Sequence, residues 1–180
     1  MVRRVLKSTC VGVGLLLGAA GPLQAQTCNR AMVESTPTSR FIRDDAKQTV
    51  TDRKTGLMWA MCANGQWGKD CKFGSVALWQ WRPALLIAAD STFAGYDDWR
   101  LPNAKELESL VEVKCAFPAM NLEVFPNAGD TEVGNAKFWS SSPVAGRDRF
   151  AWSVAFDRGV PSPDRSSSGL AGLRLVRGGM

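Results

Sequence analysis

The chain has 180 residues, with 22 Lys and Arg against 17 Asp and Glu, and it contains no histidine. Without histidine, neither a Ser-His-Asp triad nor a Cys-His pair can be assembled, so we expect no enzyme of these types and no cofactor. The small positive balance is not that of a nucleic-acid-binding protein, and we therefore expect no nucleic-acid partner.

The first 25 residues have the pattern of a secretory signal peptide. Three basic residues precede an apolar stretch from Val11 to Ala20, and Ala25 offers a small residue at the cleavage position. The apolar stretch is short for a membrane span. We therefore expect one exported domain over residues 26–180, in the periplasm or at the cell surface, with no membrane span after signal removal. An uncleaved anchor is the alternative.

Four cysteines lie beyond the predicted signal, and an even count in an exported protein suggests two disulfides. Four cysteines allow three pairings. Cys62 and Cys71 flank a loop rich in turn-forming residues, so a local bridge is the simplest choice, and it leaves Cys28 to pair with Cys115. A zinc site would need all four cysteines, and no Cys-x-x-Cys pair is present, so we expect no metal site.

The predicted elements begin after a polar lead-in over residues 27–40. Strand-like pieces at 49–52 and 57–60 predict a hairpin. A stretch rich in Ala, Leu and Trp predicts a helix over residues 75–89, bent or started by Pro83.

A second helix is expected from Asn103 to about Lys114, followed by a long loop over residues 116–136. Three short strands are then predicted, at 137–141, 150–156 and 170–176, with a mobile loop over 162–169. This order predicts an α+β domain with an antiparallel sheet.

The most informative run is Trp99-Arg100-Leu101-Pro102, directly before Asn103. Pro102 fixes its own φ and favours an extended residue before it, and Asn103 can cap the helix that follows. The run holds no nucleophile and no metal-ligand cluster. We therefore expect an architectural role, in which Trp99 is buried and Arg100 pairs with a carboxylate or with loop carbonyls.

Six spaced motifs resemble the C-terminal domain of the Legionella collagen-like adhesin (the Lcl C-terminal domain), a family long filed as a domain of unknown function. They lie at residues 36–41, 49–59, 95–110, 125–127, 138–142 and 173–179. Two of them, Arg100-Leu101-Pro102 and the run 172–177, also resemble the wider C-type lectin-like fold, including the formylglycine-generating enzymes. The resemblance implies that fold, with paired first and last strands, two flanking helices and long loops that present the binding surface.

The resemblance also implies a function. The collagen-like adhesin binds sulfated glycosaminoglycans, so it implies an exported, non-catalytic, adhesin-like domain that binds a glycan or another polyanionic ligand. The formylglycine-generating enzymes use cysteines near the chain end, and no cysteine follows Cys115, so their activity is not carried over. The alternative is a structural or assembly module of a bacterial envelope complex, with an envelope protein as its partner.

The charge is uneven along the chain. Removal of the signal leaves 19 basic and 17 acidic side chains, and residues 137–180 hold seven basic against three acidic ones. This bias predicts a ligand-binding surface, with a solvated face as the alternative. The candidate residues are Arg147, Asp148, Arg149, Arg158, Asp164 and Arg165. Arg174 and Arg177 are left out, because the terminal strand is expected to lie against the first one.

The tryptophans divide into expected core and expected surface. Trp59, Trp99, Trp139 and Trp152 lie in strand-like or motif segments and are expected to be buried. Trp67, in the presumed disulfide loop, and one of Trp79 and Trp81 are the better candidates for exposure and sugar stacking. Calcium-dependent lectins use sugar-site triplets that are missing here, and Asp97 and Asp98 are expected to shape a turn rather than to bind calcium.

Overall fold

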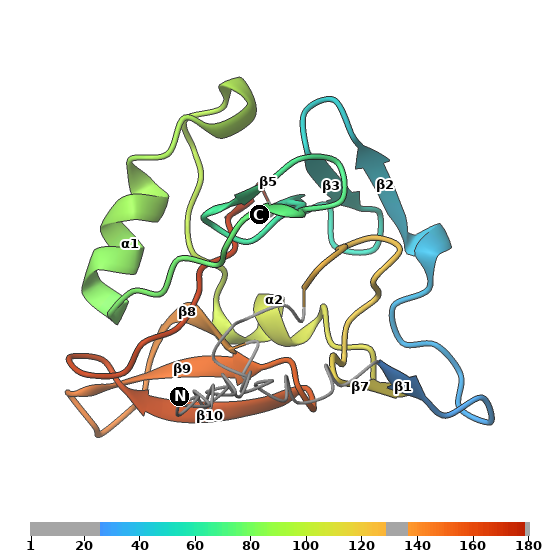
Figure 1. Ribbon diagram of the computed structural model, residues 1–180. Helices are drawn as coiled ribbons and strands as arrows, with labels where there is room; N and C mark the ends of the chain where they lie inside the picture. The colour runs from blue at the N-terminus through green and yellow to red at the C-terminus, as the bar shows by residue number, and fades with distance from the viewer. Residues whose placement is uncertain (1–25, 129–136, 179–180) are drawn as a thin grey trace, which may run out of the picture.

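The computed structural model describes residues 26–128 and 137–178 (Figure 1), so the predicted signal peptide lies outside the described residues. The strands are β1 Thr27–Cys28, β2 Phe41–Asp44, β3 Thr49–Asp52, β4 Met58–Ala60, β5 Gln66–Trp67, β6 Phe73–Gly74, β7 Cys115–Ala116, β8 Lys137–Pro143, β9 Phe150–Ala155, β10 Val160–Arg165 and β11 Val176–Arg177. The helices are α1 Trp81–Ala89 and α2 Ala104–Glu108, with short 3-10 turns at Thr38–Arg40 and Phe93–Gly95. Within these ranges, no helix has the length and apolar character needed to cross a membrane.

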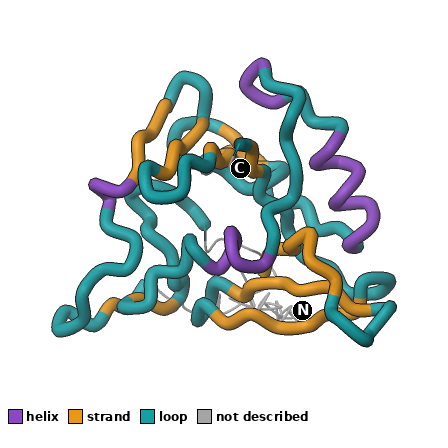
Figure 2. Tube along the Cα trace, turned by 180° about the vertical axis from the view of Figure 1, so that it is seen from behind, coloured by secondary structure: helices purple, strands orange, loops and turns teal. Residues whose placement is uncertain are grey.

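The described strands form four small antiparallel sheets, with the orders β11-β4-β3-β2, β10-β9-β8, β1-β7 and β5-β6. Figure 1 shows the β8–β10 sheet at the bottom of the molecule, the β2–β4 region at the top and α1 along one side. Figure 2 shows the same separation from behind. The mixed, antiparallel architecture confirms the predicted α+β class.

The predicted hairpin is present as β3 and β4. Val50 pairs with Trp59, and both side chains are fully buried. The turn between the strands places Gly56 at a φ of +73°, where a residue without a Cβ avoids strain. The strand-like composition of the two pieces and the turn between them were therefore sufficient to predict this unit.

The strand β8 lies between two buried clusters, because successive side chains of a strand point to opposite faces. Phe138 belongs to a cluster with Trp59, Phe125 and Val154, whereas its neighbour Trp139 belongs to a second cluster, formed around Trp99 and Leu173 on the opposite face. Both faces of β8 are thus covered. The apolar alternation predicted for 150–156 is correct at Val154 and Phe156, which are buried, whereas Phe150 and Trp152 are only partly buried.

The expected pairing of the first and last strands is wrong. β11 pairs with β4, with Val176 opposite Trp59, and β1 pairs with β7, with Cys28 opposite Cys115. The Cys28–Cys115 disulfide holds the first strand beside β7 and leaves the edge of β4 for the chain end. The C-type lectin-like fold stays a prediction.

Both helices are shorter than predicted. α1 begins at Trp81, since the preceding segment is extended and Trp79 exchanges two backbone hydrogen bonds with Ala171. Pro83 stands in the first turn, where its missing N–H leaves no bond unmade. α2 ends at Glu108, because Glu112 N–H instead donates to Ala119 O at 3.0 Å, which turns the chain away from the helix.

The prediction of a mobile loop over 162–169 is wrong for its first half. Residues 160–165 form β10, which pairs with β9 along its whole length. Pro161 and Pro163 hid this strand, since proline is rare inside sheets but is tolerated on an edge strand such as β10. The predicted strand at 170–176 is reduced to β11, preceded by single bridges at Ala171 and Gly172.

Candidate binding surface

Three of the four candidate arginines lie together at one end of the β8–β10 sheet. Arg147 and Arg149 are on the loop between β8 and β9, and Arg165 ends β10. The sheet register sets Arg165 directly opposite Phe150, the residue that follows Arg149. We call Arg147, Arg149 and Arg165 the arginine cluster, and all three side chains are exposed.

The backbone around the arginine cluster is tightly bonded. Val144 N–H donates to Phe150 O at 3.0 Å, and Phe150 N–H donates to Arg147 O at 2.9 Å. Ser166 N–H donates to Arg149 O at 2.9 Å and so ties the end of β10 to the loop. These bonds fix the positions from which the three side chains project.

Phe150 contacts two of the guanidinium groups with its ring. The Arg147 guanidinium carbon is 4.6 Å from the centre of its ring, and that of Arg165 is 5.5 Å away. Such contacts favour a cation over the face of an aromatic ring. The contact of Phe150 with these arginines was not predicted, because the sequence indicated only that Phe150 begins a strand over 150–156. The available signal was an aromatic residue directly after the basic loop.

The remaining candidates lie elsewhere. Arg158 is in the turn at the opposite end of the β9–β10 hairpin, over the Phe117 ring at 5.5 Å, so it is not part of the cluster. Asp164 turns to the other sheet face, where it bonds Ser153 Oγ and forms an ion pair with Lys137 at 3.1 Å. Asp148 stays exposed in the loop. The single patch expected from charge counting is therefore divided.

No ion pair formed by the arginine cluster is found among residues 26–128 and 137–178. By contrast, Arg177 Nε donates to Asp98 Oδ1 at 2.5 Å, and its guanidinium carbon lies 3.9 Å from the Tyr96 ring centre. The side chain of Arg174 is fully buried, donates to the carbonyls of Ala60 and Met61, and burial lowers its pKa to about 9. Arg174 and Arg177 are therefore engaged within the chain, and β11, which carries Arg177, lies against β4.

The Trp99–Pro102 segment occupies the position expected of an architectural motif. Trp99 is 2% exposed and donates its Nε1–H to Phe93 O at 2.7 Å. Leu101 is buried, and Pro102 O accepts a hydrogen bond from Ser141 N–H at 2.7 Å. The segment thus links the loop before α2 to β8.

Arg100 connects this segment to both α2 and β11. Its guanidinium donates to the two carboxylate oxygens of Glu106 at 2.7 and 2.8 Å, and its backbone exchanges two bonds with Val176. Glu106 and Asn103 also form a reciprocal capping box. Burial opposes ionisation of Glu106, but the hydrogen bonds from Arg100 and Asn103 prevail and lower its pKa.

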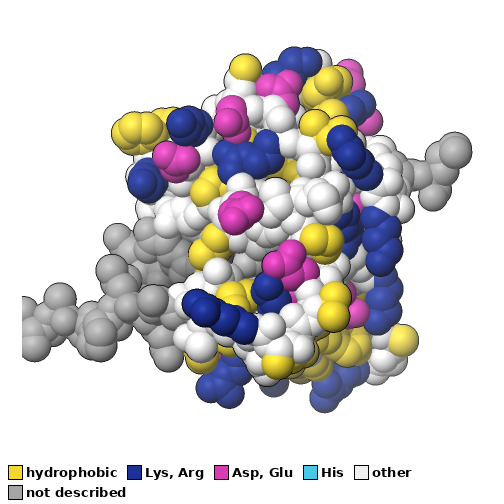
Figure 3. All heavy atoms as spheres, turned by 90° about the vertical axis from the view of Figure 1, so that its right-hand side faces the viewer, with side chains coloured by type: hydrophobic (Ala, Val, Ile, Leu, Met, Phe, Trp, Pro, Cys, Tyr) yellow, Lys and Arg dark blue, Asp and Glu magenta, His cyan; other side chains and the backbone are white. Residues whose placement is uncertain are grey.

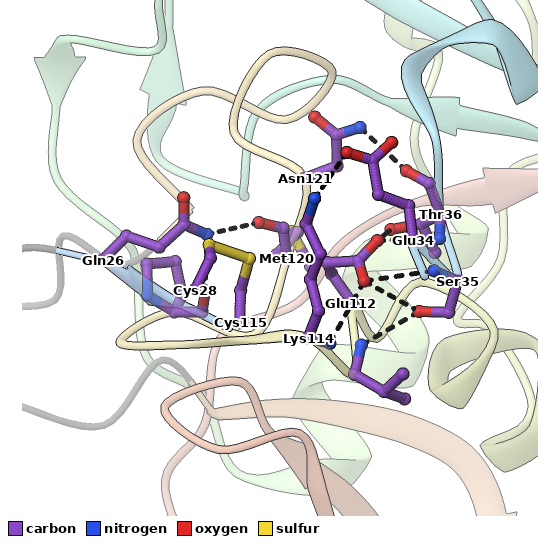
Figure 4. The surroundings of a disulfide bond; sticks show 12 residues. Gln26, Cys28, Glu34, Ser35, Thr36, Glu112, Lys114, Cys115, Met120 and Asn121 are labelled. Carbon is purple, nitrogen blue, oxygen red and sulfur yellow. Dashed lines mark hydrogen bonds and ion pairs between the residues drawn. A yellow bond between two sulfur atoms is a disulfide. The ribbon is translucent and has the colours of Figure 1, made fainter. Parts of the chain in front are cut away.

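Both predicted disulfides, Cys28–Cys115 and Cys62–Cys71, are present. A pocket of about 410 Å³ lies beside the first one and is lined by Gln26, Cys28, Glu34, Pro37, Thr38, Ser39, Glu112, Lys114, Cys115, Met120, Asn121, Leu122 and Glu123. Figure 4 shows that Gln26 reaches toward the backbone of Met120, to which its Nε2–H donates at 2.8 Å.

The Glu112 carboxylate at this pocket is already fully bonded. It is 3% exposed, and Thr36 donates to it from both its backbone N–H and its hydroxyl at 2.8 Å, with Ser35 contributing further bonds (Figure 4). Burial opposes ionisation, but these hydrogen bonds lower the pKa of Glu112. The carboxylate therefore anchors the N-terminal lead-in and has no capacity left for a ligand.

Over the side of the molecule that carries β1, β2 and β7, acidic and basic side chains are interspersed with apolar ones (Figure 3). In the described part of the chain, no three His, Cys, Asp or Glu side chains are grouped so that they could hold a metal ion. Asp98 is engaged by Arg177, whose hydrogen bond lowers the pKa of this carboxyl.

The model of the Lcl C-terminal domain family matches residues 48–177. A comparison with curated proteins finds no match. The matched range contains the arginine cluster, the Trp99–Pro102 segment and the Cys62–Cys71 disulfide. β1 and β2 precede it, yet they pair with β7 and β3 inside it, so the lead-in is an integral part of the fold.

Proposed function

Given that this chain belongs to the Lcl C-terminal domain family, we propose that it is an exported, non-catalytic binding domain for a polyanionic ligand such as a sulfated glycan. The observation that carries the proposal is the arginine cluster, whose three exposed side chains lie at one end of the β8–β10 sheet. Backbone hydrogen bonds hold the β8–β9 loop and the end of β10 together at this point. None of the three arginines forms an ion pair with a described residue.

The chemistry of arginine suits such a ligand. A planar guanidinium donates two parallel hydrogen bonds to one sulfate or carboxylate and is less strongly hydrated than an ammonium group. Phe150 holds Arg147 and Arg165 over its ring, which reduces the side-chain freedom that binding would remove. Exposed charges contribute little singly, so binding is collective and weakens as salt rises.

The test is retention on a sulfated polysaccharide column. We expect the unmodified mature protein to be retained at low salt, and a variant with Arg147→Ser, Arg149→Ser and Arg165→Ser to pass through while remaining folded. The matched control changes Arg53, Lys54 and Arg82 to Ser, which removes the same charge from exposed positions on other elements. This control should be retained nearly as well as the unmodified protein.

Two results would overturn the proposal. If the unmodified protein passes through the column at low salt, the assembly-module function takes its place, with an envelope protein as the partner. If the control variant loses retention as completely as the arginine-cluster variant, net charge rather than a site explains the binding.

A further inference from the structure

The β5–β6 hairpin, inside the loop closed by Cys62–Cys71, presents two aromatic rings to solvent. Trp67 is 57% exposed and Phe73 is 62% exposed. The two residues are direct cross-strand partners, their ring centres are 6.4 Å apart, and their planes differ by 23°. We call this pair the aromatic platform.

Each ring of the platform lies against a glycine next to the other ring's residue: Gly74 ends β6, and Gly68 directly follows β5. A Cβ added to Gly74 would approach Trp67 Cζ3 to 2.3 Å, and one added to Gly68 would approach Phe73 Cδ2 to 2.7 Å. Both glycines have positive φ, at +70° and +88°, which suits a residue without a side chain. Each ring thus rests partly on backbone, while more than half of each residue's surface stays exposed.

The loop that carries the platform is fixed by other parts of the chain. Gly68 N–H donates to Gln48 Oε1 at 2.7 Å, and Arg43 Nη2–H donates to Lys69 O at 3.1 Å. Asn127 Nδ2–H donates to Cys71 O at 2.9 Å, next to the disulfide. The rings are therefore held in place before any ligand arrives, which lowers the entropic cost of binding.

The hydrophobic cores do not require the two rings of the platform. Neither ring belongs to the two buried clusters of the described residues. Two exposed, nearly parallel rings on a fixed support are suited to stacking, because the C–H groups of a pyranose face are attracted to the electron-rich face of an aromatic ring. The loop between the two strands carries the exposed residues Lys69, Asp70 and Lys72, which are of mixed charge, so the sequence around the platform does not favour an ionic ligand.

We propose that Trp67 and Phe73 form a stacking site for an uncharged pyranose unit of an oligosaccharide. This site is separate from the arginine cluster: Figure 1 places β5 at the top of the molecule and β9 and β10 at the bottom. The proposal does not rest on polyanion binding. In it, the loop closed by Cys62–Cys71 holds the two rings in place.

The experiment is a titration of the mature protein with cellohexaose and with chitohexaose, followed by tryptophan fluorescence and by calorimetry. We expect binding of at least one of these uncharged oligosaccharides, with an affinity that does not change when salt rises to about 0.5 M. Trp67→Ala and Phe73→Ala should each weaken binding about tenfold or more, whereas Trp67→Phe should retain most of it. Leu86→Ala, which alters another exposed apolar side chain at 66% exposure on α1, is the matched control and should bind normally.

Urea unfolding should show that the platform variants remain folded, since both rings lie outside the cores. Binding of neither oligosaccharide would overturn the proposal, as would binding that survives Trp67→Ala. Trp67-dependent binding to phosphatidylglycerol vesicles without oligosaccharide binding would overturn it in favour of a membrane contact. The arginine-cluster variant should bind these sugars normally, so failure of one site is distinguishable from failure of the other.

Discussion

At the junction between the Trp99–Pro102 segment and β11, Arg100 bonds both oxygens of Glu106, and Arg177 bonds Asp98 and stacks on Tyr96. In the β8–β9 loop, Arg147 and Arg149 have no ion pair with any described residue. The two regions carry the same residue type, but in the first the guanidinium groups hold segments of the chain together, and in the second they face solvent. Partners and burial, rather than charge, separate arginines that support the fold from arginines available to a ligand.

This comparison implies that stability resides at the junction and binding in the loop. The largest expected effect is that of Trp99→Ala, which should lower the free energy of unfolding by about 3–5 kcal/mol. The ring is buried beside Phe93 and Tyr96, at centre distances of 5.6 and 6.4 Å, and its removal leaves a cavity. Urea denaturation measures the change. Trp67→Ala is the control and should change stability by no more than about 0.5 kcal/mol. A Trp99→Ala protein as stable as this control would contradict the structural role.

A smaller effect is expected at Glu106, and it depends on pH. The folded-state pKa of Glu106 is lowered, so its contribution to stability is complete above its ordinary value of 4.5 and is lost as the pH falls through the lowered value. Glu106→Gln should lower stability by about 1 kcal/mol at neutral pH, with allowance for partial exposure of the pair. It should also flatten the loss of stability as the pH falls from 4.5 through the lowered pKa of Glu106. Parallel pH profiles for the two proteins would show that the pair contributes nothing.

The smallest change in stability is expected for the arginine-cluster variant, and its comparison with Arg100→Ala tests the difference between the two regions most directly. Arg100→Ala, which also removes a bond to Gly178 O at 3.1 Å, should lower stability by about 1 kcal/mol. The arginine-cluster variant, which loses three cations, should remain within about 0.5 kcal/mol of the unmodified protein. Thermal or urea unfolding of the two variants under the same conditions shows which one loses more stability. A reversed order would mean that the loop arginines support the fold.

Several features of this molecule follow from neighbouring residues and were predicted from the sequence. Asn103 caps α2, as predicted, because its side chain accepts a hydrogen bond from Glu106 N–H within one helical turn. The β3–β4 hairpin follows from two strand-like pieces joined by a turn that contains Gly56. The Cys62–Cys71 bridge closes a short loop, and it leaves a single partner for Cys28.

Other features depend on pairing between distant segments. Pro161 and Pro163 concealed β10, since only its place at a sheet edge tolerates them. The register of β10 against β9 brings Arg165 to the loop that carries Arg147, and the same hairpin carries Arg158 to its far end. Charge counting along the chain cannot distinguish these two outcomes.

The amino-acid sequence was enough to predict the family, the α+β class, both disulfides, the burial of Trp99 and the pairing of Arg100 with a carboxylate. Most of these predictions rest on motifs, caps and turns, which depend on residues a few positions apart. The exposure of Trp67 was predicted, whereas the partner of β11, the division of the arginines and the pairing of Trp67 with Phe73 required the folded chain. Each of these features depends on which strand edge is paired, or which side chain is buried, by a segment that is distant in the sequence. Such coverage is settled by competition among long-range contacts, for which a local pattern carries no information.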